Sequence, residues 1–400
     1  MTDIKINVTS EEALELFRQN WPNPLEEVWV PIREALGRVL SQPQFAKENI
    51  PVVRASSMDG IAVRSDRFRD GIPLNLNEWQ MGIDFVRADT GDDFPEPYDA
   101  IIPIEMVEIR EEKTGLKFLE DITVTKNMNV QPCGSLVRKG QLLLPAFRQI
   151  NATDLAILAI GNLATVPVFR KPHVSFLPTG TELIQPGETL SRGKNVDSNS
   201  LMAKAMIESF GAQVNLFPIT ADDPDDLNNI LNIMLRDNDL VLINGGSSKG
   251  SEDYALRLLG KRGVLLFHWT QCGPGRPAAL ANIDGKPVIV VPGPPYGCLN
   301  VLHWLVRPII ASLMGLKKPF EYVVTARLTE EVDAPTGFKF LLGAQVSHDD
   351  DGELIVKLLN FKRAGQANCL ATNGFVHTIP GKKWQIGDLI EVTLLRPIDD

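Results

Sequence analysis

Residues 173–314 alternate between short apolar runs and amphipathic stretches, and this alternation constrains the fold more than any other feature of the sequence. We expect strands at 173–177, 214–219, 240–243, 264–269 and 288–291, and helices at 198–210, 224–236, 251–259 and 299–314. Strands that alternate with helices predict a parallel, doubly wound sheet with helices on both faces. Ligands of such sheets bind outside the carboxyl ends of the strands, so a ligand site is predicted at that edge.

The sequence on either side of this region has a different pattern of apolar and polar residues. Capping signals predict helices at 9–19 and 151–160, and a further short helix is expected at 31–40. Residues 51–144 contain short alternating segments with recurring proline and glycine, which predict mainly β structure. After Pro319 the pattern is again all β, with the acidic run 349–352 as a solvated hairpin tip.

These patterns predict a multidomain α+β chain, and 400 residues are enough for two to four domains. The expected parts are an N-terminal region formed by 1–50 and 145–172, an inserted β-rich domain at 51–144, the α/β domain at 173–318 and a C-terminal β domain at 319–400.

Charge and residue usage exclude several classes of function. Forty basic and fifty acidic residues give a net charge of −10, which argues against a general binder of nucleic acid or membrane surfaces. The four cysteines are far apart and the five histidines show no H-x-x-x-H spacing, so neither a disulfide framework nor a zinc enzyme is expected. No signal peptide or apolar span of roughly 18 residues is found, and we expect a cytoplasmic protein.

A glycine-rich loop at 245–250 (GGSSKG) follows one predicted strand and leads into a helix. Backbone N–H groups of such a loop can converge on an anion at the helix N-terminus, and Lys249 would add a full charge. The spacing does not match a Walker loop. The loop is therefore either an anion-binding loop or a plain strand-to-helix turn.

Two further loops combine glycine with proline. The segment 273–278 (GPGRPA) formally matches a dinucleotide fingerprint, but its prolines would obstruct the required helix, and no acidic residue follows about 20 positions later. We interpret this segment as a rigid loop that presents Arg276. The segment 292–297 (PGPPYG) reads as a stiff turn whose glycines permit close approach to a ligand.

Three carboxylates follow predicted strands or a loop beside them: Glu182, Asp197 and Asp253. Together they could hold Mg²⁺, which prefers a few carboxylates with substrate oxygens and water. Two of these carboxylates also have simpler possible roles than metal binding. Asp197 can cap a helix, and Asp253 can complement a helix dipole. Asp59, which precedes Gly60, is by default a turn residue.

Taken in order, these residues resemble the MoeA-type molybdopterin molybdenumtransferase family, which includes the E domain of gephyrin. The collinear motifs are EALGRVL at 34–40, SMDG at 57–60, TG at 90–91, YDAII at 98–102, TGTEL at 179–183, DSN at 197–199, GG at 245–246, DY at 253–254, PGRP at 274–277, PG at 292–293 and ATNG at 371–374. The resemblance covers nearly the whole chain.

The resemblance implies a homodimer with an irregular β domain, a central α/β domain of molybdopterin-binding type and a C-terminal β-barrel. It implies insertion of molybdenum from molybdate into adenylylated molybdopterin, with release of AMP and with Mg²⁺. The active site would lie between the central domain of one subunit and the N-terminal part of the other. The adenylyltransferase that makes the substrate and the molybdoenzymes that use the product are further expected partners.

The resemblance also assigns roles to residues. The catalytic candidates are Asp59, Thr90, Glu182, Asp253 and Arg276, with Asp59 and Thr90 coming from the partner subunit. The metal candidates are Glu182, Asp197 and Asp253. The candidates for binding the pterin and its phosphate are Thr179, Gly180, Asp197, Ser198, Gly245, Gly246, Ser247, Ser248, Lys249, Pro292, Gly293 and Pro295.

The chain departs from the family pattern where molybdate should bind. Gly273 stands where the family has a basic residue, and Pro294 and Gly297 replace an amide and a hydroxyl. One hypothesis is that Lys249 supplies the missing charge. Two alternatives to a transferase stay open: a carrier that binds molybdopterin or the finished cofactor, and a dimeric scaffold for protein partners.

Overall fold

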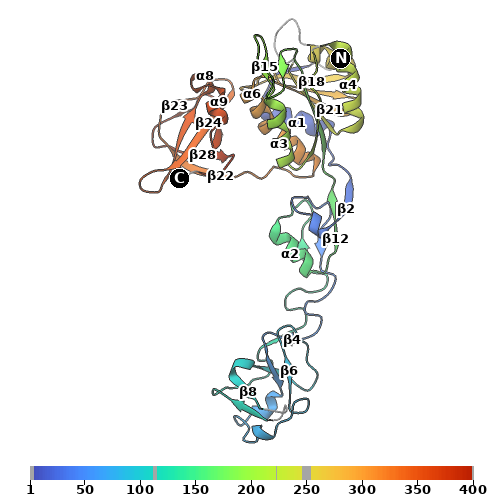
Figure 1. Cartoon of the computed structure of the whole chain (residues 1–400), viewed down its shortest axis with the longest axis vertical. Coiled ribbons are helices and arrows are strands. Elements are labelled where there is room, and N and C mark those ends of the chain that lie inside the picture. Colours follow the sequence, from blue (N-terminus) through green and yellow to red (C-terminus); the bar gives the residue numbers. More distant parts are fainter. Residues whose placement is uncertain (1–3, 111–114, 222, 246–253, 399–400) are drawn as a thin grey trace. The chain divides into compact units, whose positions relative to one another are not determined.

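The computed structural model describes residues 4–110, 115–221, 223–245 and 254–398, which form two compact units (Figure 1). Unit 1 comprises Met1–Glu27 with Phe169–Asp400, and unit 2 comprises Val28–Val168. The first 27 residues thus group with the α/β region, whereas the sequence analysis placed residues 1–50 in an N-terminal region. The reason is β1 (Lys5–Val8), a strand too short and too exposed to leave a hydrophobic pattern, which pairs in parallel with a strand of the central sheet.

The central sheet of unit 1 has seven strands in the order β1-β18-β20-β21-β17-β13-β16. Besides β1, its strands are β13 (His173–Pro178), β16 (Gln213–Leu216), β17 (Leu240–Asn244), β18 (Val264–Thr270), β20 (Ala279–Ile283) and β21 (Lys286–Val291). The five predicted strands run parallel to one another, and β20, which was not predicted, lies between β18 and β21 and pairs antiparallel with both. Only Asp284 and Gly285, both at positive φ, separate β20 from β21, and so short a turn can only form a hairpin.

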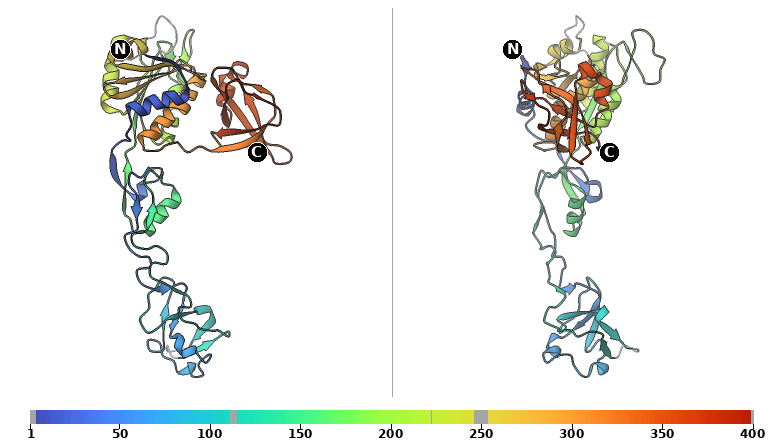
Figure 2. Two further views of the ribbon diagram at one scale, coloured as in Figure 1. Left: turned by 180° about the vertical axis from the view of Figure 1, so that it is seen from behind. Right: turned by 90° about the vertical axis from the view of Figure 1, so that its left-hand side faces the viewer.

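Helices lie on both faces of this sheet, as the alternating pattern predicts (Figure 2). They are α1 (Ser10–Asn20), α3 (Asn199–Ser209), α4 (Pro224–Asp237), α5 (Tyr254–Arg262), α6 (Pro295–Val301) and α7 (Arg307–Leu313). The capping box of Thr9 and Glu12 is confirmed. The single helix predicted at 299–314 is interrupted by a π-helical turn at Leu302–Val306, because Pro308 has no N–H to donate to the preceding turn.

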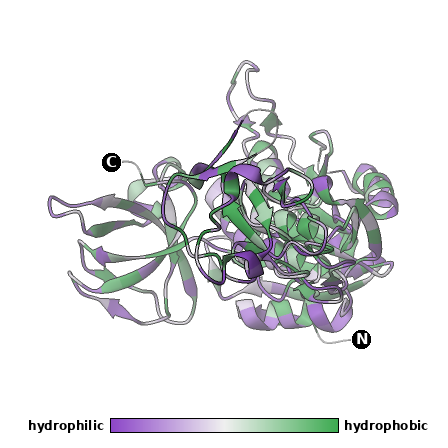
Figure 3. Cartoon of the chain, turned by 90° about the horizontal axis from the view of Figure 1, so that it is seen from below, coloured by the Kyte–Doolittle hydropathy of each residue, from purple (hydrophilic) through white to green (hydrophobic). Residues whose placement is uncertain are grey.

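The C-terminal part of unit 1 is a closed barrel of five strands. They are β22 (Val323–Leu328), β24 (Lys339–His348), β25 (Leu354–Leu359), β26 (Gly374–His377) and β28 (Leu389–Leu394). Hydrophobic positions follow the barrel strands while the hairpin tips are hydrophilic (Figure 3). The tip at 349–352 is confirmed, with the Asp349 carboxylate accepting hydrogen bonds from the N–H groups of Asp351 and Glu353. Two short helices, α8 (Phe361–Ala364) and α9 (Gln366–Leu370), were not predicted.

Unit 2 consists mainly of short strands, as the recurring prolines and glycines of residues 51–144 predict, and its described residues include one α-helix. A three-stranded antiparallel sheet contains β5 (Gly60–Val63), β6 (Phe85–Ala88) and β7 (Ala100–Pro103). The two-stranded pairs are β2 (Glu27–Pro31) with β12 (Thr165–Phe169), β3 (Gln44–Phe45) with β11 (Leu142–Leu144), β4 (Ala55–Ser56) with β10 (Val130–Gln131), and β8 (Val107–Ile109) with β9 (Leu116–Phe118).

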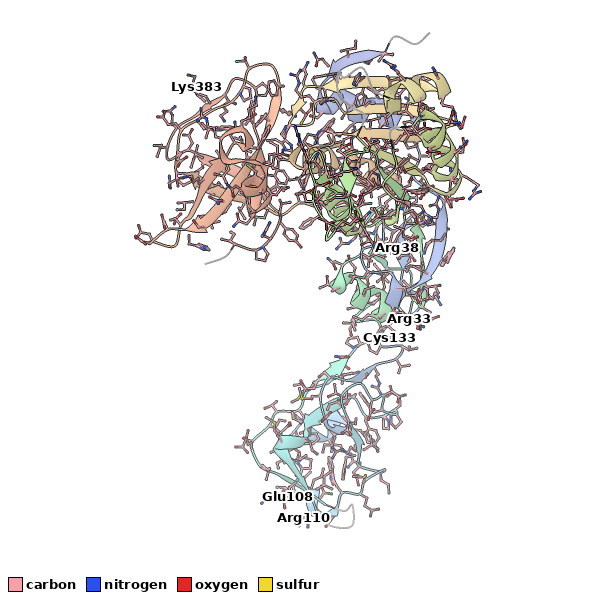
Figure 4. The ribbon with its side chains drawn as sticks, turned by 45° about the horizontal axis from the view of Figure 1, so that its top comes forward. Arg33, Arg38, Glu108, Arg110, Cys133 and Lys383 are labelled. Atoms are coloured by element: carbon pink, nitrogen blue, oxygen red, sulfur yellow. The ribbon has the colours of Figure 1, made fainter. Side chains whose placement is uncertain are left out.

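Helix α2 (Ala152–Ile160) is capped by Asn151 and Asp154, which confirms the predicted helix at 151–160. The helix predicted at 31–40 is wrong, because β2 runs into a single 3₁₀ turn at Ile32–Glu34 and Gly37 at φ +73° leads the chain away. All four cysteines are free, with Cys133 exposed (Figure 4) and the other three buried. In the described part of the chain, no helix has both the length and the apolar character that a membrane crossing needs.

A half-buried ion pair joins the starts of two central strands. The Arg170 guanidinium donates two hydrogen bonds to the Asp239 carboxylate, at 2.7 and 2.8 Å, and the N–H of His173 donates a third at 2.8 Å. Burial raises the pKa of Asp239, but the bonds from Arg170 and His173 outweigh it, and the pKa lies below its ordinary value. The charged carboxylate therefore stabilises the fold above the pKa of the unfolded chain, and this stabilisation is lost as the pH falls through the lower, folded pKa.

We expect Asp239→Asn to lower the free energy of unfolding by about 2 kcal/mol at pH 7, because hydrogen bonds to a charged group are lost. The difference from the parent should shrink as the pH falls below about 4, the pKa of an aspartate in the unfolded chain, and through the lower pKa of folded Asp239. Urea unfolding across this pH range measures both effects. The control is Asp237→Asn, which breaks an exposed pair with Arg236 and should leave the free energy of unfolding close to that of the parent. A pH-independent difference for Asp239→Asn would contradict the prediction.

Candidate functional site

A cavity of about 650 Å³ lies in unit 1 at the carboxyl ends of β13, β17 and β21. It is lined by Thr179, Glu182, Leu183, Asn195, Val196, Asp197, Ser198, Asn199, Asn244, Gly245, Gly293, Pro294, Pro295 and Gln366. The three strands are parallel, so the loops that follow them meet at one edge of the sheet. The cavity lies where ligands of α/β sheets bind.

The first wall follows β13. The buried Thr179 donates its N–H to the carbonyl of Asn244 at 2.9 Å, which ties this loop to the end of β17. Gly180 then adopts φ +145°, and the carboxylate of Glu182 folds back against it. A Cβ at Gly180 would lie 2.6 Å from both Glu182 oxygens, so glycine is needed for this arrangement. Glu182 itself is exposed in the cavity mouth.

The second wall is the start of α3, where Asp197 is 96% buried. Its Oδ1 accepts hydrogen bonds from the N–H groups of Asn199 and Ser200, both at 3.1 Å, so Asp197 does serve as a helix cap. Its Oδ2 has no hydrogen-bond partner among the residues that the structure describes, and Asp197 lines the cavity. The cap and a ligand can therefore use different oxygens of one carboxylate.

The third wall begins with Gly245, whose N–H donates to the carbonyl of Val291 at 3.0 Å. Gly245 has φ +122°, and a Cβ there would lie 2.5 Å from Thr179 Oγ1 and 2.8 Å from the Thr179 carbonyl oxygen. Only glycine fits this position without displacing the first wall. The other predicted residues near this loop, Gly246, Ser247, Ser248, Lys249 and Asp253, lie outside the described residues.

The fourth wall is the loop between β21 and α6, from which Gly293, Pro294 and Pro295 line the cavity. Pro292 takes part through its carbonyl, which accepts a hydrogen bond from the Asn244 side chain at 2.8 Å. The loop that contains Gly297 packs closely on the loop that contains Gly275. A Cβ at Gly275 would lie 2.7 Å from the Gly297 carbonyl oxygen, and a Cβ at Gly297 would lie 3.3 Å from Gly275 Cα.

The lining residues that were not predicted from the sequence include three with side-chain amides, Asn199, Asn244 and Gln366. Asn244 could have been noticed, because it is a polar residue that ends a fully buried strand beside a glycine pair. Asn199 belongs to the DSN motif but was given no role. Gln366 left no signal, because it comes from α9 of the barrel, where its Oε1 accepts the N–H of Tyr296 at 3.0 Å.

Arg276 is not brought into this cavity. Its guanidinium donates to the Thr270 carbonyl at 3.1 Å and to Asn7 Oδ1 at 3.0 Å, and it lies over the Phe338 ring with 4.9 Å to the ring centre. Gly273 is likewise packed, since a Cβ there would lie 3.3 Å from the Phe338 ring. The described lining therefore contains two carboxylates and no Lys, Arg or His.

The structure does bring Asp59 and Thr90 together, within unit 2. Thr90 donates both its N–H and its hydroxyl to Asp59 Oδ1, each at 2.8 Å. These two bonds, the one from the backbone N–H first, hold the pKa of Asp59 below its usual range. The pair is an exposed, charged hydrogen-bonding group.

A divalent metal would find few protein ligands at the cavity. Among the described residues no group of three or more His, Cys, Asp and Glu side chains is placed to hold a metal ion. The two carboxylates of the lining, Glu182 and Asp197, nevertheless suit Mg²⁺, which takes one or two carboxylates and completes its coordination with substrate oxygens and water. The donor set fits that ion provided that a substrate brings oxygens.

Comparison with known proteins covers both units. The family "MoeA N-terminal region (domain I and II)" matches residues 8–160, and the family "Probable molybdopterin binding domain" matches residues 175–312. The molybdopterin molybdenumtransferase of Haemophilus influenzae is 28% identical, across 89% of this chain and 90% of its own length. The enzyme of the same name from Staphylococcus epidermidis is 26% identical, across 92% and 91%.

Solved structures agree with these matches. A molybdopterin biosynthesis MoeA protein from Pyrococcus horikoshii has a TM-score of 0.74 and 26% identity, covering 97% of this chain and all of its own. Another structure of such a protein has a TM-score of 0.78 at 24% identity. The two family matches lie end to end along most of the chain, and the relatives match it over nearly their full length. The chain belongs to the MoeA family.

Proposed function

We propose that this chain acts in molybdenum cofactor biosynthesis as a cytoplasmic molybdopterin molybdenumtransferase, which inserts molybdenum from molybdate into adenylylated molybdopterin and releases AMP. The observation that carries the proposal is the convergence of four sequence motifs on one cavity. The TGTEL, DSN, glycine-pair and PG segments are more than 100 residues apart at their extremes, yet each lines the cavity at the carboxyl edge of the sheet. Relatives that carry the transferase name match over about nine tenths of the chain.

The chemistry asks the protein mainly to position anions and to stabilise charge. Molybdenum binds the two dithiolene sulfurs while one oxide of molybdate leaves as water with the two thiol protons. A second water hydrolyses the bond between the pterin phosphate and AMP, so AMP leaves. In the proposal, Glu182 and Asp197 would hold Mg²⁺. The ion would neutralise the negative charge of a substrate phosphate that binds beside these two carboxylates. Asp253 and Lys249, together with Gly246, Ser247 and Ser248, are proposed to complete the metal and phosphate side.

The proposal includes a homodimer. Asp59 and Thr90 form a hydrogen-bonded, charged pair in unit 2, and we propose that this pair serves the cavity of the partner subunit. The acidic carboxylate would orient the substrate or activate water, since its lowered pKa keeps it ionised at neutral pH.

One observation favours a second candidate, a carrier that binds molybdopterin or the finished cofactor. Arg276, the cation that the family resemblance places at molybdate, bonds instead to Thr270 and Asn7. A cavity that holds the pterin but offers no cation to molybdate would bind and deliver the pterin rather than insert molybdenum into it.

The deciding experiment incubates the full-length protein with adenylylated molybdopterin, Mg²⁺ and molybdate, and measures AMP and molybdenum cofactor. The transferase predicts AMP release that depends on molybdate and matches the cofactor formed. Tight pterin binding without AMP release would support the carrier and contradict the transferase. Absence of any ligand binding would contradict both.

A further inference from the structure

Two buried asparagines in the cavity wall join three of its loops. Asn244 ends β17, and its Nδ2 donates to the carbonyls of Val291 at 3.3 Å and Pro292 at 2.8 Å. Its Oδ1 accepts a hydrogen bond from Asn199 Nδ2 at 3.0 Å. Because a carbonyl can only accept, the two backbone partners fix which end of the Asn244 amide faces Asn199.

The amide of Asn199 is oriented by the same logic. Its Nδ2 donates to Asn244 Oδ1 and to the Gly293 carbonyl at 2.6 Å, so both of its hydrogens are used. Its Oδ1 has no hydrogen-bond partner in the part of the chain that the structure describes, although the side chain is 95% buried and lines the cavity. Buried polar atoms are rarely left unsatisfied, and an orphaned acceptor in a cavity wall points to a ligand that donates a hydrogen.

The main-chain donors beside Asn199 are already used. The first amides of α3, the N–H groups of Asn199 and Ser200, are occupied by Asp197 Oδ1, so this helix start offers them to no anion. Asp197 Oδ2 adds a further free acceptor among the described residues. Molybdate, phosphate esters and dithiolene sulfurs carry no hydrogen-bond donors at neutral pH. This wall therefore suits a planar heterocycle with N–H and amino groups at its edge.

We propose that Asn199 determines specificity for the pterin ring, with its Oδ1 accepting a hydrogen bond from the exocyclic amino group. Asn244 is a positioning residue that holds the Asn199 amide in this orientation. The inference rests on the proposed function, which supplies the class of ligand. Adenine carries a similar amino donor, but both asparagines lie within the segment that matches the molybdopterin binding domain, so we assign this wall to the pterin.

The test compares ligands that differ in one donor. Pterin (2-amino-4-oxopteridine) and lumazine, in which a carbonyl replaces the amino group, are titrated against the full-length protein. The parent should bind pterin about tenfold more tightly than lumazine, the value of one well-placed hydrogen bond. Asn199→Ala should bring this ratio close to one, and Asn244→Ala should lower it because the Asn199 amide is then free to turn round. Leu201→Ala, an exposed change on α3 outside the cavity lining, should leave the ratio unchanged.

The ratio is a sharp readout because a general loss of stability weakens both ligands equally. If Asn199→Ala does not fold, Asn244→Ala carries the test alone. The proposal is overturned if the parent binds neither ligand, if it does not prefer pterin, or if the variants keep the preference. It is also overturned if Asn199→Ala abolishes a preference for AMP over IMP while keeping that for pterin, which would assign Asn199 to adenine. If the parent releases AMP but does not prefer pterin, this inference alone is contradicted. If the parent prefers pterin but releases no AMP, only the transferase proposal is contradicted.

Discussion

Asp197→Asn should fold like the parent and lose about a hundredfold of its molybdate-dependent AMP release. Asparagine caps a helix as well as aspartate does, so the amide oxygen keeps the bonds from the N–H groups of Asn199 and Ser200. The negative charge, however, is gone, and with it the proposed contribution to Mg²⁺. Initial rates at saturating substrate, together with urea unfolding of both proteins, measure the two effects separately.

Asp197→Ala is the matched control, because it removes the cap as well as the charge. It should show the same loss of AMP release and, in addition, a free energy of unfolding lower by about 1 kcal/mol. If Asp197→Asn retains parental turnover, Asp197 is only a helix cap, and its proposed role at the metal is wrong.

The second large effect is expected at Gly245. An alanine there must adopt φ +122°, which costs about 1–3 kcal/mol in strain for a residue other than glycine. Its Cβ must also push away the side chain and carbonyl of Thr179, which lie at 2.5 and 2.8 Å. We expect Gly245→Ala to lower the free energy of unfolding by about 3 kcal/mol in total and AMP release by about a hundredfold or more, because the first wall of the cavity moves.

Gly293→Ala provides the comparison for stability, since Gly293 lines the same cavity. A Cβ at Gly293 meets no atom within 4 Å, and its backbone is not in the left-handed region. Urea unfolding should therefore give a free energy close to that of the parent. Equal destabilisation by the two alanines would contradict the steric account of Gly245.

Much of the fold could be predicted because its signals are local. The helices at Ser10–Asn20 and Ala152–Ile160 carry their capping boxes within four residues. What could not be predicted depends on contacts between distant segments. Strand β1 has a single buried residue, and only its pairing with β18 makes it a strand.

The candidate site shows the same division. Thr179, Glu182, Asp197, Gly245 and Gly293 could be selected because each follows a strand or begins a helix, and parallel strands bring such positions to one edge. Arg276 was a candidate because a local pattern, the rigid loop of the PGRP motif, was expected to present it. Its actual direction is set by Asn7, a residue 269 positions earlier in the chain, and no local pattern reports that contact.

The most direct test of the central claim, that the cavity is where the substrate binds, is a crystal structure of the protein with adenylylated molybdopterin and Mg²⁺ in the absence of molybdate. The account predicts ligand density between the loops that follow β13, β17 and β21, with the metal at Glu182 and Asp197 and the pterin edge at Asn199. Density for the ligand at any other place on the chain, with this cavity empty, would contradict it.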